Sequence, residues 1–502
     1  MDPSFDVILD CYTDEHSGYG VPPFLNTHPR YLAGALSLTG RRVFYLTIDD
    51  LRYANANVTT TREHFSRKDI RNTTRNRDIA QSLLSTAETV FVLMGQFVDY
   101  EYSSALPPRP TEVEQLIAAA PGKKVLIYVL STMEEGGFRI GRAFKPGLFS
   151  AFTTHPAHEF VLGKSVSYHE LHEIAVRGAA IVSQLSNLAV VEIETGRGCN
   201  WKPGCAFCVE TALRLQPQYR TPESIIAEVG ALYSQGARFF RLGRQPNLFD
   251  YMDGDPSSME RLLRGIRETC PEIQTLHVDN TSPQDVVTTS GREIARLIAT
   301  YCTSGNIGSF GVESFDPEVR QKNRLNGTVD QIIEAIEVFN EVGGTRGPDG
   351  LPIFLPGLNL IYGLNGQTER TLETNLLYLR KILDSGLMTR RTFIRGLTDM
   401  TGYLTEDSKQ FLRRKGEGLA HWQEMIEKEF VIPMLQRVAP KGAVIRNARA
   451  ELWTERGTIF RQMATCAIRL ELHGEFVEPN SFRDLDVVDH IGPKAVLARV
   501  AM

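Results

Sequence analysis

The sequence lacks the features that mark membrane, secreted and nucleic-acid-binding proteins. It has no uninterrupted apolar stretch of about 18 residues, which a membrane-spanning helix would need. The opening MDPSFDVILDCYTDE has no basic stretch followed by a long apolar run, so it does not form a signal-peptide pattern. Its 55 Lys and Arg are outnumbered by 60 Asp and Glu, and no basic tract stands out. We therefore expect a cytoplasmic protein with neither a membrane nor a nucleic acid as partner.

Cysteine is scarce, and four of the seven cysteines stand alone in the sequence. The other three, Cys199, Cys205 and Cys208, fall within ten residues. In a chain without a secretion signal, such a group indicates a metal site rather than a disulfide framework.

The first part of the chain alternates strand-like and helix-like patterns. The short apolar runs of strand type are Phe5–Leu9, Arg42–Leu46, Thr89–Met94 and Lys124–Leu130. Helical patterns at 29–38 and 111–120 lie between them. This alternation predicts an α/β, doubly wound Rossmann-like domain over residues 1–135, followed by a linker of mixed structure over 136–185.

A second strand–helix series predicts a (β/α) barrel, complete or partial, over residues 186–403. Its strands are expected at Ala189–Ile193, Phe239–Leu242, Thr275–Val278, Gly308–Val312, Leu358–Tyr362 and Thr392–Ile394. Residues 404–502 begin with a charged helical stretch and continue less regularly. We expect them to form a small C-terminal α/β extension.

The three clustered cysteines lie in EIETGRGCNWKPGCAFCVE, directly after the first strand of the second series. In a barrel, loops at the carboxyl ends of strands carry catalytic groups. Three thiolates from one loop can bind three irons of a 4Fe-4S cluster and leave the fourth iron open. Gly196, Gly198 and Gly204 let such a loop wrap closely around a compact cofactor.

Two simpler interpretations of the cysteines are a structural zinc site and chance. Zinc requires a fourth ligand, but His169 and His172 lie well upstream and Cys270 lies far downstream. Chance spacing is disfavoured because the cysteines are so few.

These residues resemble the radical S-adenosylmethionine (SAM) enzymes, which carry three cysteines with an aromatic residue before the third. Phe207 occupies that place here. The first gap holds five residues, Asn200–Gly204, where the family commonly has three.

The resemblance continues through FRLGRQ at 240–245, FGVESFDPEVRQKN at 310–323, NLIYGLNGQTERT at 359–371 and FIRG at 393–396. It implies that SAM is bound by Phe207, Gly243, Arg244, Gln245, Glu313, Ser314, Asn359 and Arg395. Asn365 and Gln367 depart from the family's usual Pro and Glu. No catalytic residue is assigned.

A doubly wound domain ahead of such a barrel resembles the cobalamin-dependent branch of the family. The resemblance implies a cobalamin, carried as methylcobalamin, at the carboxyl edge of the first sheet. The residues it points to are Asp14, His16, Ser17, Gly18, Tyr19, Gly95, Gln96, Ser131 and Thr132. The alternative is a Rossmann-like module with lost or different ligand binding. No G-x-G-x-x-G follows the first strand, which argues against a dinucleotide.

The resemblance implies a C-methyltransferase acting on an unactivated sp³ carbon. The layout is similar to the methanogen enzymes that methylate a glutamine of methyl-coenzyme M reductase. The expected partners are then a peptide segment of that reductase's catalytic subunit and an electron donor. Two alternatives stay open: a cobalamin-dependent radical SAM enzyme of small-molecule biosynthesis, and a non-catalytic iron–sulfur or corrinoid carrier.

Overall fold

The computed structural model describes residues 4–12, 23–55, 72–95, 105–128, 144–213, 216–397, 399, 402–413 and 415–501. The chain divides into two compact units, residues 1–193 with 223–240 and residues 194–222 with 241–502. This division falls inside two barrel strands and does not coincide with the predicted boundaries at 135, 185 and 403. Among the described helices, none is both long enough and apolar enough to span a bilayer.

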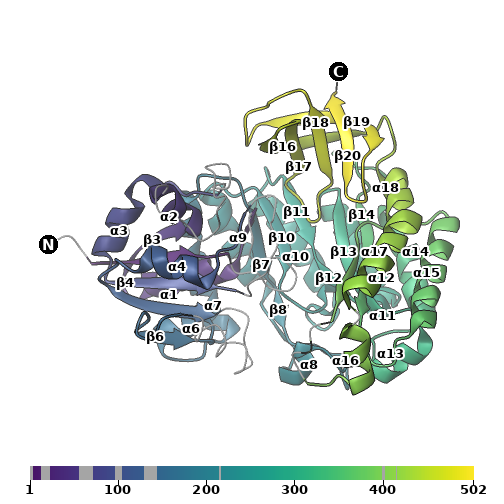
Figure 1. The fold of residues 1–502 in the computed structure, drawn as a ribbon, viewed down its shortest axis with the longest axis horizontal. Helices are drawn as coiled ribbons and strands as arrows, with labels where there is room; N and C mark the ends of the chain where they lie inside the picture. Colours follow the sequence, from purple (N-terminus) through teal and green to yellow (C-terminus); the bar gives the residue numbers. More distant parts are fainter. Residues whose placement is uncertain are drawn as a thin grey trace. The chain divides into compact units, whose positions relative to one another are not determined.

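The first unit contains a five-stranded sheet in the order β3-β1-β4-β5-β6 (Figure 1). Its strands are β1 (Phe5–Asp10), β3 (Arg42–Thr47), β4 (Thr89–Met94), β5 (Lys123–Tyr128) and β6 (Ala151–Thr153). All neighbouring pairs are parallel. The order is that of flavodoxin-like sheets, which wind outward in both directions from the first strand. The predicted Rossmann-like parallel sheet is confirmed.

Helices of the first unit pack on the sheet through apolar side chains. Leu51 of α2 (Ile48–Ala54), Leu83 of α3 (Ala80–Thr86) and Val113 of α4 (Pro110–Ile117) share one buried cluster with Val7 and Val92 of the sheet. A separate cluster joins α1 (Thr27–Leu38) to α7 (Tyr168–Gly178).

The predicted linker is wrong for its described part, residues 144–185. This segment supplies the edge strand β6 of the sheet, then α6 (Ala157–Leu162) and α7. Helix α7 approaches α1 so closely that a Cβ on Gly34 would lie 1.9 Å from the carbonyl oxygen of Ile174. The segment is therefore built into the first unit, and its three-residue strand is too short to produce a sequence pattern.

The second strand–helix series forms an open arc of parallel strands. One sheet has the order β11-β10-β7-β2 and the next has the order β12-β13-β14-β15. Strands β11 and β12 are separated only by Asp279, so residues 275–281 link the two sheets. The strands are β2 (Phe24–Leu25), β7 (Val190–Glu194), β10 (Phe239–Gly243), β11 (Thr275–Val278), β12 (Asn280–Thr281), β13 (Asn306–Glu313), β14 (Phe354–Tyr362) and β15 (Thr392–Gly396). All six predicted strands are present, in a partial barrel.

Helices follow the strands of this arc. They are α8 (Val209–Leu213), α9 (Pro222–Ser234), α10 (Pro256–Thr269), α11 (Pro283–Val286), α12 (Thr289–Tyr301), α13 (Pro317–Asn323), α14 (Val329–Gly343) and α15 (Glu369–Asp384). Phe339 of α14 lies 5.1 Å from Phe310 of β13 and 4.2 Å from Phe354 of β14, ring centroid to centroid. The helices therefore cover the outer face, and the other face lines the barrel interior.

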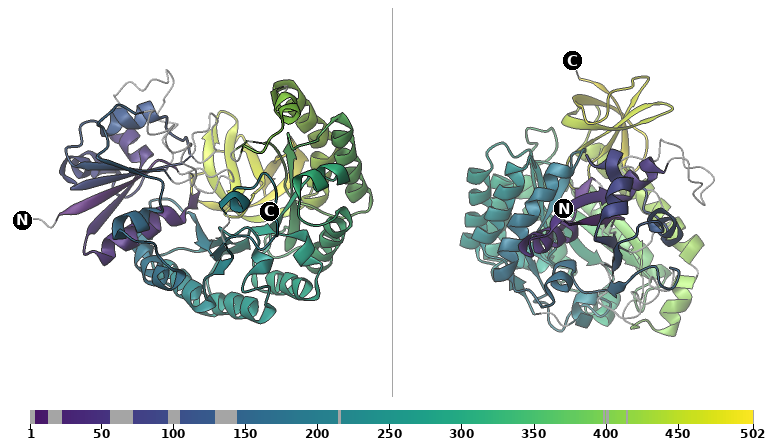
Figure 2. Two further views of the ribbon diagram at one scale, coloured as in Figure 1. Left: turned by 90° about the horizontal axis from the view of Figure 1, so that it is seen from below. Right: turned by 90° about the vertical axis from the view of Figure 1, so that its left-hand side faces the viewer.

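The predicted C-terminal α/β extension is also wrong. Helices α16 (Glu406–Arg413), α17 (Lys415–Ile426) and α18 (Ile432–Val438) come first, and five strands then close into a barrel in the order β16-β17-β18-β20-β19. The views in Figure 2 show this barrel in yellow. Its strands are β16 (Val444–Thr454), β17 (Gly457–Gln462), β18 (Arg469–His473), β19 (Phe482–His490) and β20 (Ala495–Val500). Helices and strands are thus segregated here rather than alternating.

Candidate functional site

The three clustered cysteines lie on the loop that follows β7, at the carboxyl end of the strand arc. Short strands β8 (Gly196–Arg197) and β9 (Gln218–Tyr219) pair in antiparallel fashion and close the base of this loop. Its tip is tied to α13: Ala206 N–H donates to the carbonyl of Asn323 (2.9 Å), and Trp201 Nε1 donates to that of Arg324 (3.0 Å). These contacts hold the cysteines in place.

Backbone N–H groups lie near each of the three thiol sulfurs. They favour the thiolates and so oppose the rise in pKa: Trp201 N–H at Cys199, Asn326 N–H at Cys205, and the N–H groups of residues 210 and 211 at Cys208. Such hydrogen bonds stabilise thiolates and tune the potential of a cluster that they ligate.

Burial raises the pKa of all three thiols, to about 12 for Cys205 and about 11 for Cys208. The neighbouring cysteines raise the pKa of Cys205 further, so the three sulfurs are close together. In the described residues, no three His, Cys, Asp or Glu side chains are grouped to hold a single metal ion. Neighbouring thiols that do not converge on one point suit a cubane, in which each thiolate binds a different iron. The donor set therefore fits the 4Fe-4S cluster.

Glycines let the loop fold back on itself, as the sequence predicts. Gly198 and Gly204 have φ values of +80° and +89°, which favour glycine. A Cβ on Gly198 would lie 2.4 Å from the carbonyl oxygen of Gln216, and one on Gly204 would lie 2.3 Å from Oγ1 of Thr211. Side chains at these positions would push the loop out of its present path.

The end of β10 brings Gly243, Arg244 and Gln245 to the same edge as the cysteine loop. The Gly243 carbonyl accepts from Thr195 N–H (3.4 Å), and Thr195 Oγ1 donates to Gln245 Oε1. Arg244 has a φ of +55°. Gln245 is buried, and its Nε2 has no hydrogen-bond partner. This amide N–H group is therefore free to meet an acceptor on a ligand.

Glu313, at the end of β13, carries the second unpaired group. Its φ is +58°, its Oε2 is buried without a hydrogen-bond partner, and a Cβ on Gly311 would lie 2.9 Å from its Oε1. Burial raises its pKa to about 8, which the nearby Arg395 and Arg320 oppose. The Glu313 charge also raises the pKa of Cys205, so this carboxyl group lies beside the cysteine loop.

Ser314 faces the surrounding helices, whereas Asn359 faces the barrel interior. The Ser314 hydroxyl is fully buried, donates to Asn375 Oδ1 of α15 (3.3 Å) and accepts from Asp316 N–H (3.2 Å). It is thus turned toward the helices, away from Glu313. Asn359 is half-buried on β14, beside Gly311 in the strand register, and it lies on the interior face.

Phe207 packs against apolar side chains of α13 and of the turn that follows β14. Its ring contacts a small apolar cluster that includes Val319 and Leu364, and it lies 6.4 Å from the ring of Tyr403. The side-chain oxygen of Gln367, which replaces the family's usual Glu, accepts the N–H groups of residues 363 (2.6 Å) and 364 (3.2 Å). The Gln367 side chain therefore stabilises the turn after β14.

Two further polar groups at this edge were missed by sequence reasoning. Thr281 ends β12, and its buried Oγ1 has no hydrogen-bond partner. Asn326 donates from Nδ2 to Ser282 Oγ (3.0 Å), and its Oδ1 has none. Gln245, Thr281 and Glu313 lie at or directly after strand ends, and Asn326 follows α13. Together they offer a ligand buried hydrogen-bond donors and acceptors. Neither Thr281 nor Asn326 carries a local sequence signal, because one lies beyond the apolar run Thr275–Val278 and the other beyond a helix.

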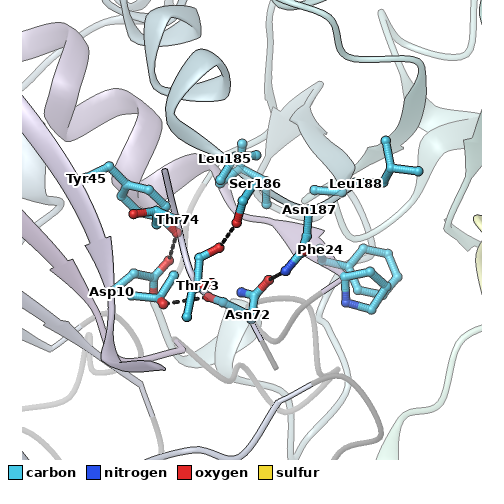
Figure 3. Close-up of a pocket in the computed structure, with 14 residues that line it drawn as sticks. Asp10, Phe24, Tyr45, Asn72, Thr73, Thr74, Leu185, Ser186, Asn187 and Leu188 are labelled. Atoms are coloured by element: carbon cyan, nitrogen blue, oxygen red, sulfur yellow. Dashed lines mark hydrogen bonds between the residues drawn. The ribbon is translucent and has the colours of Figure 1, made fainter. Parts of the chain in front are cut away.

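The first unit has a small pocket at the carboxyl edge of its sheet (Figure 3). Asp10, at the end of β1, accepts from the Tyr45 hydroxyl (2.8 Å), and Asn187 Nδ2 donates to Asn72 Oδ1 (3.3 Å) on another wall. The cavity volume is about 20 Å³, room for a single water molecule. It is far too small for a corrin or its nucleotide.

Of the residues predicted to bind cobalamin, Gly95 lies in the described part of the chain. Gly95 is buried directly after β4, beside the point where the chain's winding direction reverses. Outside the described residues lie Asp14, His16, Ser17, Gly18, Tyr19, Gln96, Ser131 and Thr132. The cobalamin site therefore stays a prediction.

Comparison with known proteins places this geometry in a family. A model of the radical SAM superfamily matches residues 193–379. An uncharacterized protein of Methanocaldococcus jannaschii, MJ0274, is 32% identical over 98% of this chain and 93% of its own length. One from Archaeoglobus fulgidus is 30% identical over 98% and 89%. The cobalamin-dependent S-adenosylmethionine radical enzyme OxsB, solved in its apo form, shares the fold with a TM-score of 0.50 at 13% identity, covering 84% of this chain and 56% of its own. The chain therefore belongs to the radical SAM superfamily, in a family that it shares along nearly its whole length with the Methanocaldococcus protein.

Proposed function

We propose that the protein cleaves SAM reductively at a 4Fe-4S cluster held by Cys199, Cys205 and Cys208. A bound cluster would pass on one electron from an external donor, and this electron would break the sulfur–C5′ bond of SAM to give methionine and a 5′-deoxyadenosyl radical. The radical takes a hydrogen atom from a substrate carbon and becomes 5′-deoxyadenosine. The observation that carries this proposal is the loop after β7, which brings three thiols together with backbone N–H groups directed at each sulfur.

The unpaired polar groups beside the cluster loop support a SAM site at the same edge. Gln245 Nε2 can donate to the SAM carboxylate or a ribose oxygen, and Glu313 Oε2 and Asn326 Oδ1 can accept from its amino or hydroxyl groups. Burial makes each of these hydrogen bonds more favourable than the same bond in water.

We further propose that the reaction is methylation of an unactivated sp³ carbon, with cobalamin as the methyl carrier. A flavodoxin-type sheet ahead of the barrel supports this, as does the shared fold with OxsB. Bound cobalamin would supply a methyl group that a carbon radical can accept. The peptide segment of methyl-coenzyme M reductase stays the substrate that the sequence resemblance predicts.

A second candidate is radical chemistry on a small molecule with the same cofactors. The positively charged side chains of Arg391 and Arg395, beside Phe393 on the interior face of β15, favour it. They can hold an anionic group within the barrel.

The test is SAM cleavage by anaerobically reconstituted protein with dithionite, with and without hydroxocobalamin. We expect 5′-deoxyadenosine and methionine from the wild type and from the control Cys302→Ala, and none from Cys205→Ala. Cobalamin-dependent S-adenosylhomocysteine would support methyl transfer. Failure of reconstituted wild type to form 5′-deoxyadenosine would favour the carrier interpretation over the enzyme.

A further inference from the structure

The interior face of β15 carries cations around one aromatic ring. Arg391 directly precedes the strand, and Phe393 and Arg395 lie on the same face because strand side chains alternate. The Cζ atoms of Arg391 and Arg395 lie 3.5 and 5.1 Å from the centroid of the Phe393 ring. Lys494, on the loop between β19 and β20, places Nζ 5.8 Å from the same centroid. We call Arg391, Phe393, Arg395 and Lys494 the cation cluster.

The strand register places this cluster inside the barrel. Phe393 pairs with Asn359 of β14, which pairs with Gly311 of β13, and paired residues of parallel strands point to the same face. Phe310 points the other way, onto Phe339 of α14. Gly311 has no side chain, and the carboxyl group of Glu313 lies beside it, where a Cβ would come within 2.9 Å of Oε1.

The cations of this cluster differ in their acidic neighbours, and the charge of Arg395 acts on the carboxyl group of Glu313. Within the described ranges, no carboxylate forms a salt bridge with Arg391 or Lys494. Arg391 Nη1 contacts the thiol of Cys466, while its Nε is buried without a hydrogen-bond partner. The adjacent Arg390 is 7% exposed and donates from Nη2 to the Cys466 carbonyl (2.7 Å), while its Nη1 is buried with no partner. Two neighbouring guanidinium groups thus retain unused donors.

The charges of Arg391 and Lys494 are not compensated by a salt bridge with any described carboxylate. Like charges that share one ring repel each other, and contact with the ring face offsets this only in part. The backbone at Arg391 has a φ of +67°, a conformation that residues other than glycine rarely adopt. Strained, positively charged sites of this kind occur where a ligand supplies the missing charge.

We propose that the cation cluster, with Arg390, binds a carboxylate or phosphate group of a small-molecule substrate. The inference rests on the small-molecule candidate within the proposed radical SAM function, not on the peptide, and names the charged group of that substrate. Arginine forks match both anions bidentately, and Lys494 adds a point charge.

The distance along β15 from Arg391 to Arg395 fits the length of a small molecule. From Arg391 to Arg395 the strand rises about 13 Å. Arg395 acts on Glu313, which lies beside Cys205 at the cluster end of the site. An anion held at Arg391 and Lys494 therefore leaves the rest of the molecule to extend toward the atoms where hydrogen is removed.

The test is isothermal titration of the full-length apo protein with inorganic phosphate and, separately, with malonate. We expect saturable binding of one anion per chain, weakened at least tenfold in Arg391→Gln and in Lys494→Gln. Lys494→Arg should keep binding. The control is Lys441→Gln, which removes an exposed lysine paired with Asp489 near the same β-barrel. Lys494 is exposed, so its variants keep the test valid should Arg391→Gln not fold.

Tighter binding of phosphate would indicate a phosphorylated substrate and tighter binding of malonate a carboxylate, and either supports the proposal. Absence of saturable binding, or equal binding by all variants, would overturn it. Displacement of the anion by SAM would also overturn it, because the cations would then belong to the SAM carboxylate. The assay needs no iron–sulfur cluster, so its failure is separate from a failure to form 5′-deoxyadenosine.

Discussion

Lowering the pH should destabilise the protein through His277 of β11. Its Nδ1 accepts the N–H of Thr465 (3.1 Å), and its Nε2 lies 3.0 Å from the carbonyl oxygen of Ser304, so the neutral ring uses both nitrogens. Burial lowers the pKa of His277 to about 3, and the charges of Arg390 and Arg241 lower it further, against the bond to Ser304. In the unfolded chain the His277 ring takes up a proton with a pKa of about 6.5, whereas in the folded chain the ring stays neutral at that pH. Stability is therefore complete above pH 6.5 and is lost as the pH falls.

The magnitude follows from proton linkage. Each pH unit below 6.5 costs about 1.4 kcal/mol while the folded ring stays neutral. Between pH 7 and pH 5 the loss attributable to His277 is therefore about 2 kcal/mol. This figure requires only that the pKa of His277 in the folded protein lie below 5, and the value of about 3 meets this condition. The loss stops growing once the pH falls below the folded pKa.

The assay compares urea unfolding of wild type and His277→Gln at pH 7 and pH 5. Glutamine can accept from Thr465 and donate to Ser304 but does not titrate. We expect the wild type to lose about 2 kcal/mol more than the variant, since all other titrating groups cancel in the comparison. Equal pH dependence in the two proteins would refute the reasoning. So would a His277 ring resonance in NMR that titrates near pH 6.5 in the folded protein.

Three other substitutions test particular contacts. Gly204→Ala, whose Cβ would meet Thr211, should lower the iron bound after reconstitution, and a full complement of iron would show that the loop tolerates a side chain there. Gln367→Leu removes the acceptor of two turn N–H groups and should cost about 1–3 kcal/mol, measured as a lower Tm. Arg30→Met removes the guanidinium group that pairs with the buried Glu228 and should cost about 3–5 kcal/mol, much of it restored by adding Glu228→Met; no restoration would contradict a paired role.

Most of the longer strands of the parallel sheets could be predicted because they are buried on both faces. Such strands form continuous apolar runs, and the predicted Thr89–Met94 and Thr275–Val278 match β4 and β11 residue for residue. Helix–strand alternation also predicted parallel sheets. Strand order within the first sheet could not be read from the runs, because all of its strands look alike in sequence.

The C-terminal barrel escaped prediction in part because its longest strand, β16, breaks the alternating pattern. Strand β16 has register shifts at residues 445–448 and 450–452, so its apolar residues do not recur at every second position. Arg449 and Glu451 are buried within the same strand, 3.8 Å apart. Buried charges in a strand that bends are a tertiary feature, and period-two reasoning has no means of finding it.

At the candidate site, spacing predicted the three cysteines, and structure was needed for most other groups. Glu313 ends β13 with a φ of +58° and Ser314 follows the strand, so strand alternation could not predict where either side chain points. Thr281 and Asn326 come together with them only through the fold. Nothing local distinguishes these two from ordinary polar residues at strand and helix ends.

The central claim is that Cys199, Cys205 and Cys208 hold a 4Fe-4S cluster. The most direct measurement is iron and acid-labile sulfide per chain after anaerobic reconstitution of the wild type, Cys205→Ala and the control Cys302→Ala. We expect about four irons per chain in the wild type and the control, with the EPR signal of a reduced cubane, and loss of that signal in Cys205→Ala. An intact cubane in Cys205→Ala, or one iron or fewer in the wild type, would contradict the account.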